Sequence, residues 1–167
     1  MRIARLGQRV IEYDVERIKT LLGGAAGVAV YNSTDITITN SAVWTELTFD
    51  SERKDNFGFH STVSNTSRLT VPDGYEGWYT ITGHVTFDTS TSGTRRDVGI
   101  RLNGTTYVDI SNVPVGNFPL RPLTAAVTYL EVGDYVELMV YQDTGGPLDI
   151  LAQVAYSPEF RMVRTRW

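Results

Sequence analysis

The side chains that could do acid–base or metal chemistry are few in this chain of 167 residues. Its two histidines, His60 and His84, are far apart in the sequence and lack the spacing of a metal-ligand pair. We interpret His84 as a strand residue, with a role at a symmetry axis or in metal binding as the alternative. The chain has no cysteine, which excludes disulfides, thiolate metal sites and a cysteine nucleophile.

Two groups of carboxylates could bind calcium, or in one case act as a glycosidase pair. Asp143 and Asp149 flank a Gly-Gly-Pro turn. The second group lies in and near residues 51–56, which we predict to form a charged loop. Its members are Glu46, Asp50, Glu52 and Asp55. Solvated loops are the favoured interpretation of both groups, and we expect no bound metal and no cofactor.

The short motifs of common enzymes are absent. The sequence has no Gly-x-Ser-x-Gly elbow, no phosphate-binding Gly-x-x-x-x-Gly-Lys-Ser/Thr loop and no Gly-x-Gly-x-x-Gly fingerprint. We therefore predict that the protein is not an enzyme.

Charge is distributed unevenly along the chain. The net charge is −4, but residues 1–22 carry +2 and the last seven residues +3, so that residues 23–160 hold −9. An acidic body argues against nucleic acid as a partner, and no apolar run is long enough to span a bilayer. The basic ends could dock on an acidic protein surface, or their arginines could simply be solvated.

The remaining pattern is that of short β-strands. Val, Thr, Ile and aromatic residues alternate in about ten short segments, with turn signals every 8–12 residues, which predicts an all-β sandwich or barrel. A Pro-Asp-Gly turn at residues 72–74 precedes a long strand over residues 78–87, and Asn103-Gly104 marks a hairpin.

The first 27 residues form a separate region in this interpretation. Apolar residues at 11, 15, 18 and 22 have helical spacing, which predicts a helix over residues 11–22; a strand through residues 10–15 is the competing prediction. Gly23-Gly24 and Gly27 form a glycine hinge. We thus divide the chain into an anchoring arm with hinge, residues 1–27, and a β-domain, residues 28–167.

Several segments, in order, resemble the jelly-roll superfamily of tumour necrosis factor and the complement globular heads. They are residues 44–55, 69–87, 100–104, 129–138 and 157–160. The resemblance implies a jelly-roll β-sandwich that forms a homotrimer through aromatic and aliphatic faces, with both termini at one base. It implies packing roles, in the trimer or the core, for Tyr79, Val85, Phe87, Tyr135, Leu138 and Phe160.

The basic termini would then lie together and form an attachment surface. The residues we expect to anchor the protein to a partner are Arg2, Arg5, Arg9, Arg17, Lys19, Arg164, Arg166 and Trp167.

Residues 1–9 are charged and lack the apolar stretch of a secretory signal, which favours a bacteriophage protein over an exported hormone-like one. We expect a virion structural protein that decorates or cements the capsid and binds the major capsid protein or another virion protein. The alternative is a receptor- or carbohydrate-binding head of a tail or head fibre, with a host surface glycan as its partner.

Overall fold

The computed structural model describes residues 25–39, 41–153 and 157–165. Within these residues there are twelve β-strands and no helix, and so none that could cross a membrane. The prediction of an all-β fold is confirmed. The strands are β1 (Gly27–Tyr31), β2 (Ile36–Ile38), β3 (Thr45–Glu46), β4 (Ser51–Asp55), β5 (Arg68–Thr70), β6 (Gly77–His84), β7 (Arg95–Leu102), β8 (Thr106–Pro114), β9 (Leu123–Leu130), β10 (Tyr135–Gln142), β11 (Leu148–Ile150) and β12 (Glu159–Arg164).

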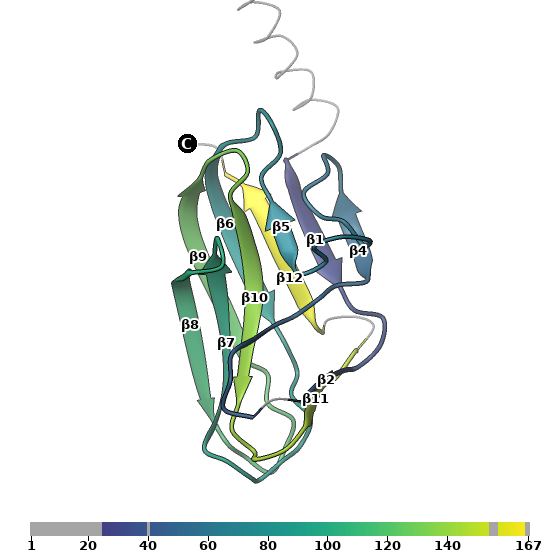
Figure 1. Cartoon of the computed structure of the whole chain (residues 1–167), viewed down its shortest axis with the longest axis vertical. Coiled ribbons are helices and arrows are strands. Elements are labelled where there is room, and N and C mark those ends of the chain that lie inside the picture. Colours follow the sequence, from purple (N-terminus) through teal and green to yellow (C-terminus); the bar gives the residue numbers. More distant parts are fainter. Residues whose placement is uncertain (1–24, 40, 154–156, 166–167) are drawn as a thin grey trace, which may run out of the picture.

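Two antiparallel sheets pack face to face (Figure 1). The first sheet has the strand order β4-β1-β12-β6-β9. The second has the order β3-β10-β7-β8, with β5 also pairing with β10. A short ribbon of β11 and β2 lies at one end. Because β1 pairs with β12, the sandwich is complete only when both ends of the domain are in place.

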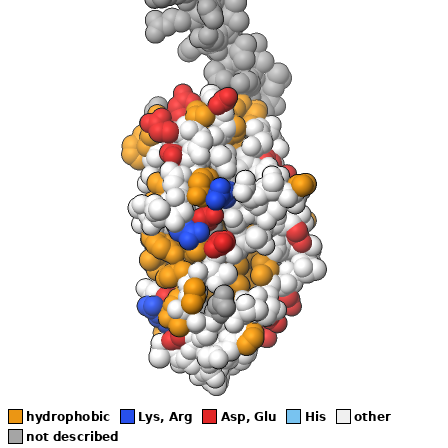
Figure 2. All heavy atoms as spheres, in the orientation of Figure 1, with side chains coloured by type: hydrophobic (Ala, Val, Ile, Leu, Met, Phe, Trp, Pro, Cys, Tyr) orange, Lys and Arg blue, Asp and Glu red, His pale blue; other side chains and the backbone are white. Residues whose placement is uncertain are grey.

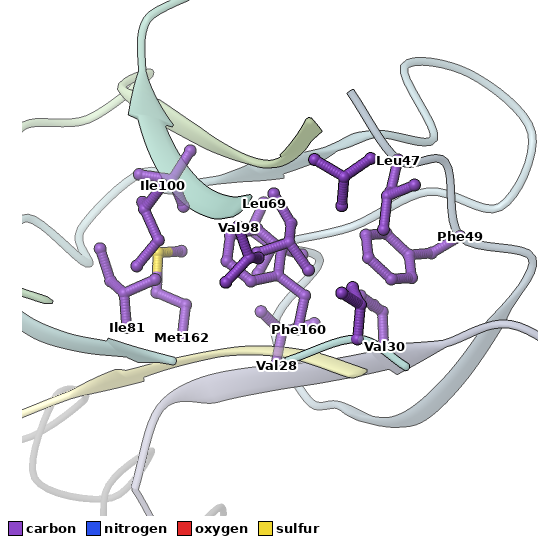
Figure 3. Close-up of a cluster of buried hydrophobic side chains, with 14 of the residues drawn as sticks. Val28, Val30, Leu47, Phe49, Leu69, Ile81, Val98, Ile100, Phe160 and Met162 are labelled. Carbon is purple, nitrogen blue, oxygen red and sulfur yellow. The ribbon is translucent and has the colours of Figure 1, made fainter. Parts of the chain in front are cut away.

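The core lies between the sheets and follows from strand alternation. Every second side chain of a strand points to the same face, and in β6 these are Tyr79, Ile81 and Gly83. Phe160 and Met162 of β12 continue this inner layer, and Figure 3 shows them facing apolar side chains of the second sheet. Gly83 makes room for this packing, since a Cβ there would lie 2.3 Å from Leu138 Cδ1.

The prediction of a loop at residues 51–56 is wrong, because residues 51–55 form strand β4. Four of the five β4 side chains are charged, which hides the strand pattern in the sequence. β4 lies at the edge of the first sheet and pairs with β1 only, with Val30 opposite Glu52. Charged residues are common on edge strands, where they discourage pairing with other chains.

The two described ends of the domain lie side by side. Gly27 of β1 is opposite Val163 of β12, and the Arg164 amide donates a hydrogen bond of 2.8 Å to the carbonyl of Ala26. The described part of the chain therefore begins and ends at the same end of the sandwich. The helix predicted for residues 11–22 lies outside the described residues.

Substitution of Phe160 by alanine tests the core. Phe160 is fully buried and its ring stacks on Phe49 at a centroid distance of 6.0 Å. We expect Phe160→Ala to lower the free energy of unfolding by about 3–5 kcal/mol, measured by urea denaturation, because the cavity cannot close. Val63→Ala, at a position that is 90% exposed, is the control and should change it by less than about 0.5 kcal/mol. Equal effects of the two would contradict this core assignment.

Candidate functional site

The outward face of β9, at one edge of the first sheet, is apolar where a solvated strand would be polar. On β9, alternation directs four residues away from the core, and all four are apolar: Leu123, Ala125, Val127 and Tyr129. Leu123 and Val127 are 58% and 56% exposed. In a sheet that faces water, this set of positions is normally polar.

The same surface continues across β6 and β12. Trp78 lies opposite Tyr129, and their rings meet edge to face at 5.9 Å. Thr80 separates Val127 on one side from Val163 on the other. We call this surface the apolar face, made of Leu123, Ala125, Val127, Tyr129, Trp78 and Val163. Contiguous exposed apolar residues of this kind are typical of a protein interaction site.

The edge of β9 is closed to strand addition near its start. Asp109 of β8 accepts hydrogen bonds from the Ala125 amide at 3.1 Å and the Thr124 hydroxyl at 2.5 Å. An edge strand with free amides can pair with another chain, and here the Asp109 carboxylate already accepts the hydrogen bond of one such amide. A partner of the first sheet is therefore expected to pack on its face.

Charged groups flank the apolar face on the β12 side. The Glu159 side chain is buried and forms ion pairs with Arg53, at 3.3 Å, and with Arg161. His84 is opposite Glu159 in register on one side and opposite Leu123 on the other. This puts His84 on the outward surface of the first sheet, beside the apolar face.

The packing residues predicted from the resemblance lie mostly inside one protomer. Tyr79, Val85, Phe87, Leu138 and Phe160 are all fully buried, so none of them can contact a neighbour. Tyr135 is half-buried on the second sheet, under the guanidinium of Arg68. The exposed apolar residues of β9 were not singled out from the sequence, although their alternation is visible there.

Among the predicted anchoring residues, only Arg164 lies in the described part of the chain. It donates a hydrogen bond of 2.7 Å to the Glu76 carbonyl, and its guanidinium fills the space that a side chain at Gly77 would need. Arg164 thus has a contact within the domain, next to the end of β12. The other predicted anchors are outside the described residues: Arg2, Arg5, Arg9, Arg17, Lys19, Arg166 and Trp167.

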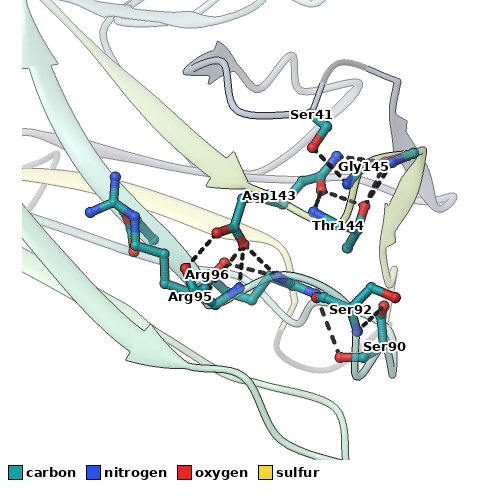
Figure 4. Close-up of polar contacts among 12 residues, drawn as sticks. Ser41, Ser90, Ser92, Arg95, Arg96, Asp143, Thr144 and Gly145 are labelled. Carbon is teal, nitrogen blue, oxygen red and sulfur yellow. Dashed lines mark hydrogen bonds and ion pairs between the residues drawn. The ribbon is translucent and has the colours of Figure 1, made fainter.

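Asp143, one of the calcium candidates, ties two loops together (Figure 4). Its carboxylate accepts hydrogen bonds from the Thr94 amide at 2.9 Å and the Arg95 amide at 3.1 Å, and forms an ion pair with buried Arg96 at 3.3 Å. Burial alone would raise the pKa of Asp143, but these contacts outweigh it and lower the pKa to about 2. Asp149 has a different partner, the hydroxyl of Thr37 at 2.6 Å.

The other candidate carboxylates are also bound to protein groups. Asp55 accepts hydrogen bonds from the backbone amides of Phe57, Gly58 and His60, which follow it in the chain. Glu52 lies 2.9 Å from His60 Nδ1. Burial would raise the pKa of Asp50, but hydrogen bonds from Ser33 and Ser51 lower it overall. Residues 25–39, 41–153 and 157–165 contain no group of three or more His, Asp or Glu arranged to hold a metal ion.

Comparison with known proteins bears on the fold. No family model and no curated protein matches this chain. Murine APRIL has a TM-score of 0.62 at 11% identity, covering 84% of this chain and 99% of that one. Eiger TNF of S. frugiperda has a TM-score of 0.57 at 12% identity, covering 85% of this chain and 93% of that one. The globular domain of zebrafish complement 1qA has a TM-score of 0.53 at 13% identity, covering 84% of this chain and 98% of that one.

The chain has the TNF/complement-head jelly-roll fold. The predicted jelly roll is therefore confirmed, with twelve described strands in place of about ten. At these low identities the likeness establishes the fold alone.

Asp143→Asn tests the loop connection. A lowered pKa stabilises the folded state at pH values above the unfolded-state pKa, and this contribution is lost as pH falls from about 4 to about 2. We expect the variant to melt about 5 °C lower than the wild type at pH 6 and the difference to vanish near pH 2, measured by circular dichroism. A difference that is constant over this range would refute the assigned role.

Proposed function

We propose that the protein is a non-enzymatic head domain that forms a homotrimer through the apolar face. The observation that carries this proposal is the row of outward apolar residues on β9, together with Trp78 and Val163 on the neighbouring strands. The similarity of the fold to TNF ligands and a complement head supports it. The candidate carboxylates Asp50, Asp55, Asp143 and Asp149 are engaged in structural hydrogen bonds.

A rotational assembly suits the shape of the apolar face. The face extends across β9, β6 and β12, with Val127 near one side and Val163 near the other. If the β9 side of one protomer packs on the β12 side of the next, the contact is head-to-tail, and it forms a closed ring when the rotation between neighbours closes. Three copies would each cover the apolar face of a neighbour.

Within this function, the proposed setting is a bacteriophage virion, where the trimer decorates or cements the capsid. The two described ends of the domain lie together at Gly27 and Val163, so both basic termini leave from one end. Residues 23–160 carry −9, which would leave an acidic body facing outward. The proposed partner is the major capsid protein or another virion protein with an acidic docking surface.

A second candidate function is that of a receptor- or carbohydrate-binding head on a tail or head fibre. The observation that favours it is a group of aromatic side chains on the outward face of the second sheet, away from the proposed trimer contact. Trp44 lies there between Tyr107 and Tyr141.

Val127→Asp tests the trimer contact. A carboxylate on the β9 side of the apolar face would be buried without a partner in the assembly, and the cost of burying it should dissociate the assembly. We expect the variant to elute later than the wild type in size-exclusion chromatography, with the same β-sheet circular dichroism spectrum. Val63→Asp, at an exposed loop position, should elute with the wild type. If Val127→Asp also elutes with the wild type, the apolar face is not the contact.

Neutralising the basic arm tests the anchoring role. We expect a variant with glutamine in place of Arg2, Arg5, Arg9, Arg17 and Lys19 to bind native virus particles at least tenfold more weakly in co-sedimentation. A matched variant with lysine at the four arginines keeps the charge and should retain most binding. Attachment of the wild type and of this lysine variant should weaken at high salt. Full attachment of the glutamine variant would contradict the proposal.

A further inference from the structure

The outward face of the second sheet has a different character from the apolar face. Figure 2 shows hydrophobic side chains gathered over β7 and β8, with basic side chains on both sides. Three aromatic rings form part of this surface. The Trp44 ring lies 5.1 Å from that of Tyr107 on β8 and 5.6 Å from that of Tyr141 on β10, tilted by 48° to each. Because β7 runs between β8 and β10, Trp44 spans it.

The row of rings is possible because β7 has a glycine beneath it. Gly99 lies opposite Met139 on one side and Ile110 on the other. A Cβ at Gly99 would lie 3.3 Å from Tyr107 Cδ1, which is closer than an ordinary contact, so a side chain there would crowd the Tyr107 ring. The Tyr107 ring thus lies close to the backbone of β7 at Gly99, and all three rings remain partly exposed.

Guanidinium groups stand at both ends of the row. Arg101 is held by Glu137, with distances of 3.0 Å and 2.8 Å from its Nε and one terminal nitrogen to Glu137 Oε2. At the other end, the Arg95 guanidinium carbon lies 4.6 Å from the centre of the Tyr141 ring. Glu137 thus holds the Arg101 guanidinium in place, whereas the Arg95 side chain rests on the Tyr141 ring and is 47% exposed. Both guanidinium groups can donate further hydrogen bonds.

Asp97 is the least satisfied group on this surface. It is fully buried on the outward side of β7, in register with Tyr141 and Asn112. Neither of its oxygens accepts a hydrogen bond from a described residue, and its contact is an ion pair at 3.2 Å with Arg95, whose side chain is 47% exposed. A carboxylate can accept about four hydrogen bonds, and a buried one is costly when it accepts none.

We propose that these residues bind a neutral sugar of a surface polysaccharide. We call the site the aromatic platform: Trp44, Tyr107, Tyr141, Arg95, Arg101 and Asp97. A pyranose ring stacks its C–H face on Trp44, and its hydroxyls bond to Arg95 and, as Arg95 turns outward, to Asp97. The inference rests on the second candidate function and is independent of the trimer contact, which lies on the other sheet.

Charge and size select this class of ligand. Each arginine of the platform is paired with a carboxylate, Arg95 with Asp97 and Arg101 with Glu137, so the surface attracts neither a polyanion nor a polycation. A protein interface needs about 20–30 residues a side, and the platform has far fewer. Aromatic faces with fixed donors and an unused acceptor match the alternating C–H and O–H groups of a sugar.

The test is an array of immobilised neutral oligosaccharides of glucose, galactose, mannose and N-acetylglucosamine, probed with the full chain. The strongest binder is then titrated by saturation-transfer NMR. We expect Trp44→Ala to weaken binding at least tenfold and Trp44→Tyr to retain most of it. Phe118→Ala, which removes an exposed aromatic ring from the loop after β8, is the control and should bind like the wild type. Should Trp44→Ala fail to fold, Tyr141→Ala takes its place.

Two binding results would overturn the inference: no binding by the wild type at millimolar sugar, or undiminished binding by Trp44→Ala. A change in the assembly mass of Trp44→Ala would also overturn it, because the platform would then be a contact between copies. The Val127→Asp variant separates the two proposals. Its protomers should still bind sugar if the platform is the site, even where the trimer is lost.

Discussion

The first sheet exposes apolar side chains on its outer face, over β9 and over one end of β6 and β12, and the other features of the molecule are arranged around this constraint. An antiparallel sheet in a sandwich normally covers the core with one face and meets water with the other. In β6 and β12 the inner face holds Tyr79, Ile81 and Phe160, yet the outer face carries Trp78 and Val163. These outer side chains are shielded from water only when something packs on them, and exposed apolar area of this kind favours association.

The charged groups complement this arrangement. Buried acids on the second sheet each contact arginine, as Glu137 does with Arg68 and Arg101. A buried carboxylate without such a partner would be strongly destabilising. Ionic contacts lie along the outward surface of the second sheet, at the loop end around Asp143, and around Glu159 on the β12 side of the first sheet. The outward residues of β9 are free of charge. The uncharged β9 side is the surface that we propose for self-association, and the outward face of the second sheet is the one that we propose for a ligand.

Local signals in the sequence predicted turns and most strands well. Gly74 and the Asn103-Gly104 pair have the positive φ angles that the predicted turns require, at 78°, 50° and 71°. The long strand predicted over residues 78–87 corresponds to β6, which the structure places at Gly77–His84. β4 was missed because charged side chains interrupt the apolar pattern and only its pairing with β1 makes it a strand.

The candidate sites were harder to predict, for a physical reason. In β9 the core-facing residues are Thr124, Ala126, Thr128 and Leu130, while the outward ones are larger and more apolar. Alternation alone would have placed the wrong side in the core. The aromatic platform joins Trp44 to Tyr107 and Tyr141, which are far apart in the chain, so that only the order of strands in the second sheet brings them together.

Sedimentation equilibrium of the unmodified full chain over a wide dilution series tests the central claim most directly. If the outer side of the first sheet is covered by neighbouring copies, the fitted mass will be three times the 18.6 kDa of one chain and will hold on dilution. A fitted mass of one chain at every concentration would contradict the account.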